Sequence, residues 1–187
     1  SQKIAPTGSL DISSNYAGGS LANHIQGTIS ASDITITNNI GDPGVRFNAC
    51  NLTANSGDIT IDSNSYNGIG NFSYNGVSVF SDATFTSNGT ISISSNTTSD
   101  NTGHNAVFFD IVTITAPTVN INNNANKNSN GTTVFFLNGA INSINSTSSN
   151  SILTMNDNTN IGGANSSGIT FNDQTTLHMA TISLSNN

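Results

Sequence analysis

Apolar and polar residues alternate in short runs along the whole chain, and one run recurs. The pattern apolar-x-apolar-x-x-Asn occurs seven times, at intervals of 24 to 34 residues. Strict alternation is typical of a strand that is buried on one face only. The seven asparagines that close the pattern are Asn15, Asn39, Asn64, Asn96, Asn124, Asn158 and Asn187. A fixed run with variable spacing indicates a solenoid whose loops differ in length.

A second run precedes the first in most repeats and places an aromatic residue shortly before a large apolar one. A small or medium residue stands two positions before the large one, consistent with one inward strand face. The pairs are Phe47 and Leu52, Phe80 and Phe85, Phe109 and Ile114, Phe136 and Ile141, and Phe171 and Leu177, and the smaller residues are Cys50, Ala83, Val112 and Gly139. Each repeat is therefore predicted to hold two or three short strands.

Two or three strands cannot bury a core alone, but stacked parallel coils can. We predict an all-β protein, a right-handed parallel β-helix of about seven coils, forming one domain over residues 1–187 and cut from a longer filament. The recurring Asn suits a corner, because Asn tolerates a positive φ and its amide can bond to the Asn one coil above. The seven asparagines are thus predicted to form a structural ladder.

Composition and net charge exclude some classes of function. The chain has 3 Lys and Arg against 10 Asp and Glu, a formal net charge of −7. A nucleic-acid ligand is excluded because binding it requires a basic surface. No apolar run approaches the length of a membrane span, so no transmembrane segment is expected. No cofactor motif is present either.

Candidate catalytic chemistry is sparse, so we expect no enzyme. Asp33 and Asp58 share a register, which leaves open a glycosidase pair, a calcium site or two solvated corner carboxylates. No third acid stands in register, and the last interpretation is favoured. His24, His104 and His178 lie in different coils, so no metal site is expected. Cys50 is expected to be a buried free thiol.

Longer connections carry the candidate binding residues, because recognition usually resides in loops on a rigid scaffold. These connections span 66–76, 97–105, 127–133 and 143–151. The first carries Tyr66, Phe72 and Tyr74, which either stack on a sugar or protein partner or pack on the flank of the helix. Seven Asn-x-Ser/Thr sequons are possible glycosylation sites: Asn51, Asn71, Asn88, Asn96, Asn130, Asn145 and Asn165.

The stretches 44–61 and 76–93 resemble repeats of the large exoproteins of bacterial two-partner secretion, the filamentous haemagglutinin and high-molecular-weight adhesin family. The resemblance implies a secreted β-helical filament held at the cell surface of a Gram-negative bacterium. Its implied partners are a host-cell surface glycan or protein receptor and, during secretion, an outer-membrane transporter. Members carry Asn-linked hexoses at sequons. The family's Asn-Pro-Asn-Gly signature is absent, which is expected of a segment downstream of the secretion domain.

Three functions remain open at this stage. The leading hypothesis is a non-enzymatic adhesin segment that binds host glycans or proteins through its loops. The second is a structural spacer of a surface filament, in the manner of autotransporter or polymorphic outer-membrane protein passengers. The third is a carbohydrate-active enzyme that uses Asp33 and Asp58.

Overall fold

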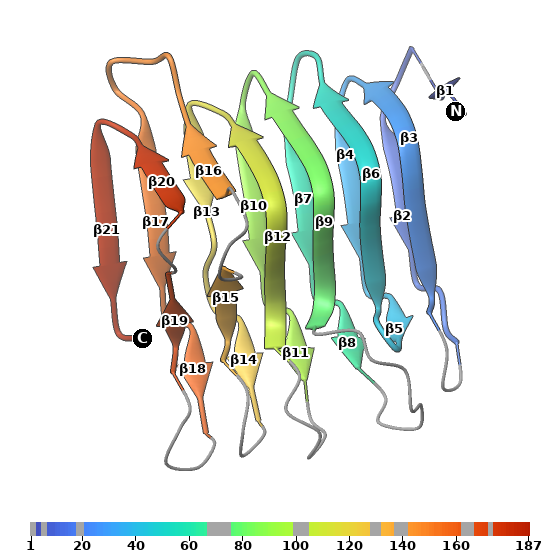
Figure 1. The fold of residues 1–187 in the computed structure, drawn as a ribbon. Helices are drawn as coiled ribbons and strands as arrows, with labels where there is room; N and C mark the ends of the chain where they lie inside the picture. Colours follow the sequence, from blue (N-terminus) through green and yellow to red (C-terminus); the bar gives the residue numbers. More distant parts are fainter. Residues whose placement is uncertain are drawn as a thin grey trace.

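The computed structural model describes residues 3–4, 7–17, 21–66, 76–98, 105–127, 132–136, 142–161, 167–171 and 174–187. Every regular element in these ranges is a β-strand, and all strand pairs are parallel (Figure 1). The strands form three sheets that we name A, B and C. The predicted all-β parallel β-helix is therefore confirmed.

The three sheets take their strands in turn from successive coils. Sheet B contains β2 (Leu10–Ser13), β4 (Ile34–Thr37), β7 (Ile59–Asp62), β10 (Thr90–Ser94), β13 (Thr118–Asn120), β17 (Ile152–Asn156) and β21 (Thr181–Ser185). Sheet C contains β5 (Ile40–Gly41), β8 (Ser65–Tyr66), β11 (Thr97–Thr98), β14 (Ala125–Asn126) and β18 (Thr159–Asn160).

Sheet A holds the longest strands. It contains β1 (Lys3–Ile4), β3 (Asn23–Ala31), β6 (Val45–Ala54), β9 (Gly76–Ser87), β12 (Asn105–Thr115), β15 (Val134–Phe136), β16 (Asn142–Asn145), β19 (Ile169–Thr170) and β20 (Thr175–His178). In the last two coils a pair of short strands replaces one long strand, because both β15 and β16 pair with β12.

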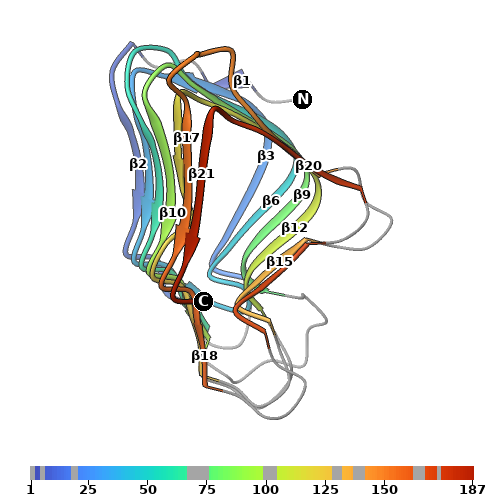
Figure 2. The same ribbon diagram turned by 90° about the vertical axis from the view of Figure 1, so that its left-hand side faces the viewer.

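Each of the five coils from β3 to β18 runs through sheet A, sheet B and sheet C before the next begins. Figure 2 looks along the stack from its C-terminal end and shows the three sheets as the sides of a triangle. The chain rises along sheet A, descends along sheet B and returns through sheet C, counter-clockwise as it advances towards the viewer. The stack is thus right-handed, as predicted.

The repeated apolar pair forms the core side of sheet B. Ile34 and Ile36 lie in register with Ile59 and Ile61 of the next coil, and all four side chains are fully buried. The residues between them point outward, as the two-residue period of a strand requires. Stacking apolar side chains at every coil gives one continuous core, which no single coil can form.

The Asn ladder runs the length of the stack. From Asn15 to Asn187 each carboxamide nitrogen donates to the Oδ1 of the next ladder asparagine, at 2.9 to 3.1 Å. From Asn39 to Asn187, the carboxamide of each ladder residue also donates to a strand carbonyl of the preceding coil, as Asn64 does to Ile36. Each Oδ1 also accepts a backbone N–H from the preceding ladder residue, as Asn124 does from Asn96. The interior amides, Asn39 to Asn158, are fully buried and fully bonded.

The strained corner position is not the one predicted from the sequence. The positive φ falls on the residue before each ladder asparagine, namely Ser14, Asn38, Ser63, Ser95, Asn123, Asp157 and Asn186. The ladder residue itself donates its own N–H along the stack, so the preceding residue makes the turn. All seven are Ser, Asn or Asp, and Asn and Asp in particular tolerate this conformation.

Sheet A carries an aromatic ladder on its inner face. Phe47, Phe80, Phe109, Phe136 and Phe171 follow one another with ring centroids 4.7 to 5.0 Å apart. Cys50, Ala83 and Val112 share the predicted neighbouring column. The stacked inward aromatics are confirmed.

The predicted register is wrong in one coil. Ile144, and not Ile141, continues the column between Ile114 and Leu177. Asn142 takes the place assigned to Gly139 and accepts the Val112 N–H through Oδ1 at 3.1 Å. Ile141 and Gly139 lie outside the described residues. Because β15 and β16 are separate strands, the inward apolar residue comes three positions later than the spacing in the other repeats predicts.

Candidate functional site

The two corner aspartates bind backbone rather than each other. Asp33 Oδ1 accepts the backbone N–H of Asp58 at 3.1 Å, and Asp58 Oδ1 accepts that of Thr90 at 2.6 Å. Asp33 also accepts hydroxyl hydrogens from Ser9 and Ser32. The Asp58 N–H, followed by these hydroxyls, lowers the pKa of Asp33. Each carboxylate thus joins its own coil to the next, which is a structural role.

Two glycines make these joints possible. A β-carbon on Gly57 would collide with the Asp33 carboxylate, and one on Gly89 would collide with that of Asp58. Glycine is required where backbone approaches another group this closely. Gly57 and Asp58 are adjacent in the sequence. This coil therefore leaves space for the Asp33 carboxylate of the preceding coil and supplies the Asp58 carboxylate that binds the next coil.

The aromatic binding site predicted at Tyr66, Phe72 and Tyr74 needs correction at Tyr66. Only 4% of the Tyr66 side chain is exposed, and its hydroxyl donates to Asp42 Oδ2 at 3.5 Å. A buried ring cannot stack on a ligand, so for Tyr66 the other interpretation holds, that the ring packs on the β-helix. Phe72 and Tyr74 lie outside the described residues.

Sequence reasoning did not find the tight corner around Asp42. This carboxylate is buried, and a cis peptide bond joins it to Pro43. Gly44 follows, where a β-carbon would meet the carbonyl oxygens of Asn39 and Ser65. The signal in the sequence is the Asp-Pro-Gly run, which is typical of a turn.

The sequons differ sharply in accessibility. Asn96 is fully buried in the ladder, so this predicted glycosylation site is wrong for the folded protein. Asn51 and Asn88 are exposed and Asn145 is half-buried. Asn88 lies at the corner between sheets A and B and donates to the Asn55 carbonyl at 2.5 Å. Asn71, Asn130 and Asn165 lie outside the described residues.

The structure brings no metal-binding group together in the part of the chain that it describes. Within the described ranges there is no cluster of three or more His, Cys, Asp or Glu side chains. His24 and His178 are exposed on different coils, and His104 lies outside the described residues. Cys50 is buried, and desolvation, with a smaller contribution from Asp82, raises the pKa of its thiol to about 12.

Three of the predicted long connections, 66–76, 97–105 and 127–133, and a further one after Asn160 that was not predicted, begin in one column at the edge of sheet C. Tyr66, Thr98, Asn126 and Asn160 end β8, β11, β14 and β18, which pair in register one coil apart. After each of them the chain passes to sheet A, at Gly76, Asn105, Val134 and Ile169. In the preceding coil only 42–44 separate β5 from β6. One corner of the triangle therefore collects these four connections.

The outer face of sheet B is flat and polar, but its side chains bond to one another. Ser94 donates to Asp62 at 2.7 Å, and Thr154 donates to Asn120 at 2.7 Å while accepting from Asn122 at 3.0 Å. These bonds join side chains of neighbouring coils. The face thus reinforces the stack.

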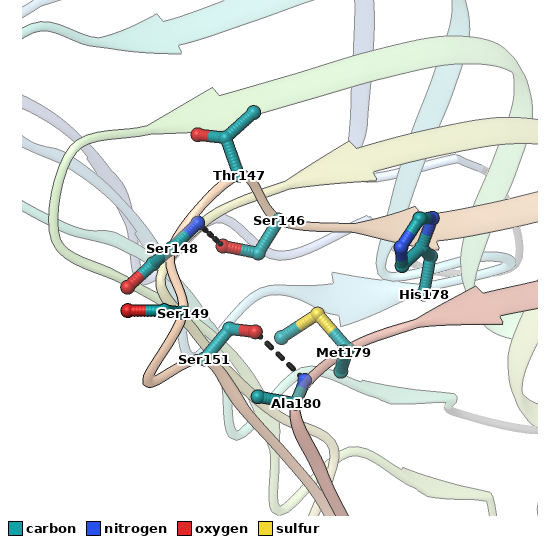
Figure 3. Close-up of a pocket in the computed structure, with 8 residues that line it drawn as sticks. All are labelled: Ser146, Thr147, Ser148, Ser149, Ser151, His178, Met179 and Ala180. Carbon is teal, nitrogen blue, oxygen red and sulfur yellow. Dashed lines mark hydrogen bonds between the residues drawn. The ribbon is translucent and has the colours of Figure 1, made fainter.

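A shallow pocket of about 300 Å³ lies at the corner between sheets A and B near the C-terminal end (Figure 3). Hydroxyl groups line one side, and His178, Met179 and Ala180 line the other. The buried Ser151 hydroxyl accepts the Ala180 N–H at 2.9 Å, and the Ser146 hydroxyl accepts the Ser148 N–H at 3.1 Å. The second bond shapes the loop itself, and the first joins this corner to that of the next coil. The predicted connection 143–151 is too long, because 143–145 belong to β16, and the remaining residues supply this pocket wall.

Comparison with known proteins assigns no family. No protein-family model, curated protein or solved structure matches this chain. Within the described residues, no helix is both long and apolar enough to cross a bilayer.

Proposed function

We propose that this chain is a non-enzymatic segment of a secreted bacterial surface adhesin of the two-partner secretion type. It binds a host-cell glycan or protein through the corner between sheets C and A. The observation that carries this proposal is the column formed by Tyr66, Thr98, Asn126 and Asn160, from which the four long connections start. Variable connections gathered on one edge of a regular scaffold are typical of a recognition surface.

The scaffold supports this role because its interior is fixed independently of the corner. The Asn ladder repeats at each coil, and the Phe ladder at each coil from Phe47 onward, whatever the length of the connection. Connections of different length and composition are thus accommodated without a change in the core. The interval between ladder residues varies between 24 and 34 residues, while the amide hydrogen bonds of the ladder stay between 2.9 and 3.1 Å.

A structural spacer is the second candidate, and a separate observation favours it. The Asp33 and Asp58 carboxylates and the outer face of sheet B engage in bonds between coils. Such a surface stabilises a rod without offering a ligand site. The same bonds weigh against a carbohydrate-active enzyme, because a catalytic carboxylate must be available to the substrate.

Binding to receptors separates the two candidates. The purified, folded chain is probed against a broad glycan array and against intact host cells in parallel. Saturable binding to a defined sugar or to cells supports the adhesin proposal. A sample that is folded by circular dichroism and silent in both assays supports the spacer and contradicts the adhesin assignment.

A further inference from the structure

One connection from sheet A to sheet B is longer than those of the coils beside it. Residues 116–117 connect β12 to β13 and residues 179–180 connect β20 to β21, whereas the six residues 146–151 connect β16 to β17. In Figures 1 and 2 this longer connection, which we call the corner loop, arches above the short corner between β20 and β21. The pocket of about 300 Å³ lies between the two. It therefore exists because a long corner lies beside a short one.

Both walls of this pocket come from adjoining coils of the chain. The Ser146 N–H donates to the His178 carbonyl at 3.1 Å, and the Ala180 N–H donates to the Ser151 hydroxyl at 2.9 Å. Both ends of the corner loop are thus fixed to the next coil. Figure 2 shows the loop outside the triangle of the three sheets, so coils that stack along the axis do not fill the space beneath it.

Hydrogen bonds inside the corner loop hold it in one shape without a ligand. The Ser148 N–H donates to Ser146 Oγ at 3.1 Å, and the Asn150 N–H donates to Ser148 Oγ at 3.3 Å. The Ser151 N–H also donates to the Ser148 carbonyl at 3.3 Å. Within the described part of the chain the hydroxyls of Ser146 and Ser148 donate to no acceptor, so both hydrogens are available to a bound molecule. The site is preformed, as most small-molecule sites are.

The lining suits a molecule that carries several hydroxyl groups and no charge. Thr147 and Ser149 are exposed, and among the described residues their hydroxyls have no hydrogen-bond partner. None of the eight lining residues that Figure 3 labels is Lys, Arg, Asp or Glu, so the pocket offers no ion pair to a charged ligand. Met179, Ala180 and the His178 ring form the other wall. This wall is largely apolar and fits the C–H face of a sugar ring.

We propose that this pocket binds one neutral hexopyranose ring. Its volume of about 300 Å³ is at the lower end of the range of small-molecule sites, which suits a single ring. The hydroxyls of the corner loop bind those of the sugar, while Met179 and the His178 ring pack on its apolar face. The site lies at the corner between sheets A and B. It is therefore separate from the recognition surface proposed at the corner between sheets C and A, and does not rest on it.

Chemical-shift mapping by NMR of the full chain with D-galactose, D-glucose and D-mannose tests the proposal. At least one of these hexoses is expected to shift the amide signals of residues 146–151 and 178–180 until they saturate. The imidazole signals of His178 are expected to shift as well, whereas those of the exposed His24 do not. Glucuronate, which carries a carboxylate, and glycerol, which has no ring, are expected to bind at least about tenfold more weakly than the best hexose.

Two variants change one wall each. His178→Ala removes the ring, and the double variant Thr147→Ala with Ser149→Ala removes two hydroxyls of the corner loop. All three side chains are exposed, so the fold is expected to remain unchanged. Each variant is expected to weaken binding of the hexose about tenfold. Thr176→Ala is the matched control, because Thr176 is exposed on the same strand as His178 and is not among the described lining residues. It is expected to leave binding unchanged.

Four outcomes overturn the proposal. The first is that none of the hexoses shifts the signals of the corner loop. The second is binding that both variants leave unchanged. The third is glycerol or glucuronate that binds as strongly as the best hexose, because the pocket then selects neither a ring nor a neutral ligand. The fourth is a set of shifts confined to the corner between sheets C and A. In that case the proposed function stands and this inference fails.

Discussion

Asn64 and Asn96 are 32 residues apart in sequence, yet the Asn64 amide donates to Asn96 Oδ1 at 3.1 Å. Both side chains are fully buried. This bond, repeated along the stack, aligns each coil with the next. Asn96 is also the acceptor of the Ser78 hydroxyl at 2.9 Å, so several buried groups depend on this one carboxamide.

Replacing Asn96 by alanine should therefore be among the most damaging changes in the chain. It leaves the Asn64 amide and the Ser78 hydroxyl without their acceptor, and each unsatisfied buried group costs roughly 1–3 kcal/mol. We expect Asn96→Ala to lower the free energy of unfolding by about 3–5 kcal/mol in urea titrations. Asn15→Ala, at the exposed end of the same ladder, should cost about 1 kcal/mol. Equal costs at the two positions would show that burial of the ladder does not matter.

The contact between Gly57 and Asp33 gives a second prediction. Gly57→Ala should destabilise the fold by about 1–3 kcal/mol, because the new methyl group meets the Asp33 carboxylate. In an Asp33→Ala background most of this cost should disappear, since the nearest atoms all belong to Asp33. A double-mutant cycle from urea unfolding measures this coupling.

Two further glycines act as controls for that cycle. Gly8→Ala should be nearly neutral, because no atom lies within 4 Å of the added carbon. Gly89→Ala should be rescued less by Asp58→Ala, because its β-carbon also meets the Gly57 backbone. Strictly additive effects of Gly57→Ala and Asp33→Ala would contradict the contact.

Acid should reduce the contribution of the Asp33 carboxylate to the stability of the fold. The Asp58 N–H lowers the pKa of Asp33 in the folded state, so its contribution to stability is present above the unfolded value of about 3.9. This contribution is lost as the pH falls through the lower folded pKa. Urea unfolding between pH 7 and pH 2 should therefore show a smaller loss of stability for Asp33→Asn than for the unsubstituted chain. Identical pH profiles for the two proteins would show that the ionised Asp33 carboxylate does not stabilise the fold.

The Cys50 thiol should be inert in the folded protein. Its pKa is raised to about 12 by burial, and the thiolate is the reactive species. We expect no alkylation at pH 8 under native conditions and complete alkylation in denaturant, as measured by mass spectrometry. Above the unfolded thiol pKa of about 8.5, ionisation favours the unfolded chain. Rapid native alkylation would contradict the buried position of Cys50.

The fold was predictable because its determinants are local and repeated. Alternation around Ile59 and Ile61 defines a strand, and the recurrence of Asn64 defines the coil. The register of Ile144 was not predictable, because a connection of unusual length precedes it. The choice between burial and exposure of Tyr66 stayed open for a related reason: its partner Asp42 comes from the preceding coil, and sequence spacing does not show which residues of variable connections meet.

The corner between sheets C and A is the central functional claim, and an equilibrium titration of labelled chain on intact host cells tests it most directly. The double variant Phe72→Ala and Tyr74→Ala changes the first long connection, whereas Tyr16→Ala removes an aromatic that is 68% exposed in the first coil, two coils away from that connection, where it pairs with Ile40. Tyr66 is left unchanged because it is buried. We predict binding that weakens at least about tenfold, or about 1.4 kcal/mol, in the double variant and is unchanged in Tyr16→Ala, with all three proteins equally folded. Binding that is equally strong in all three would contradict a recognition surface at this corner.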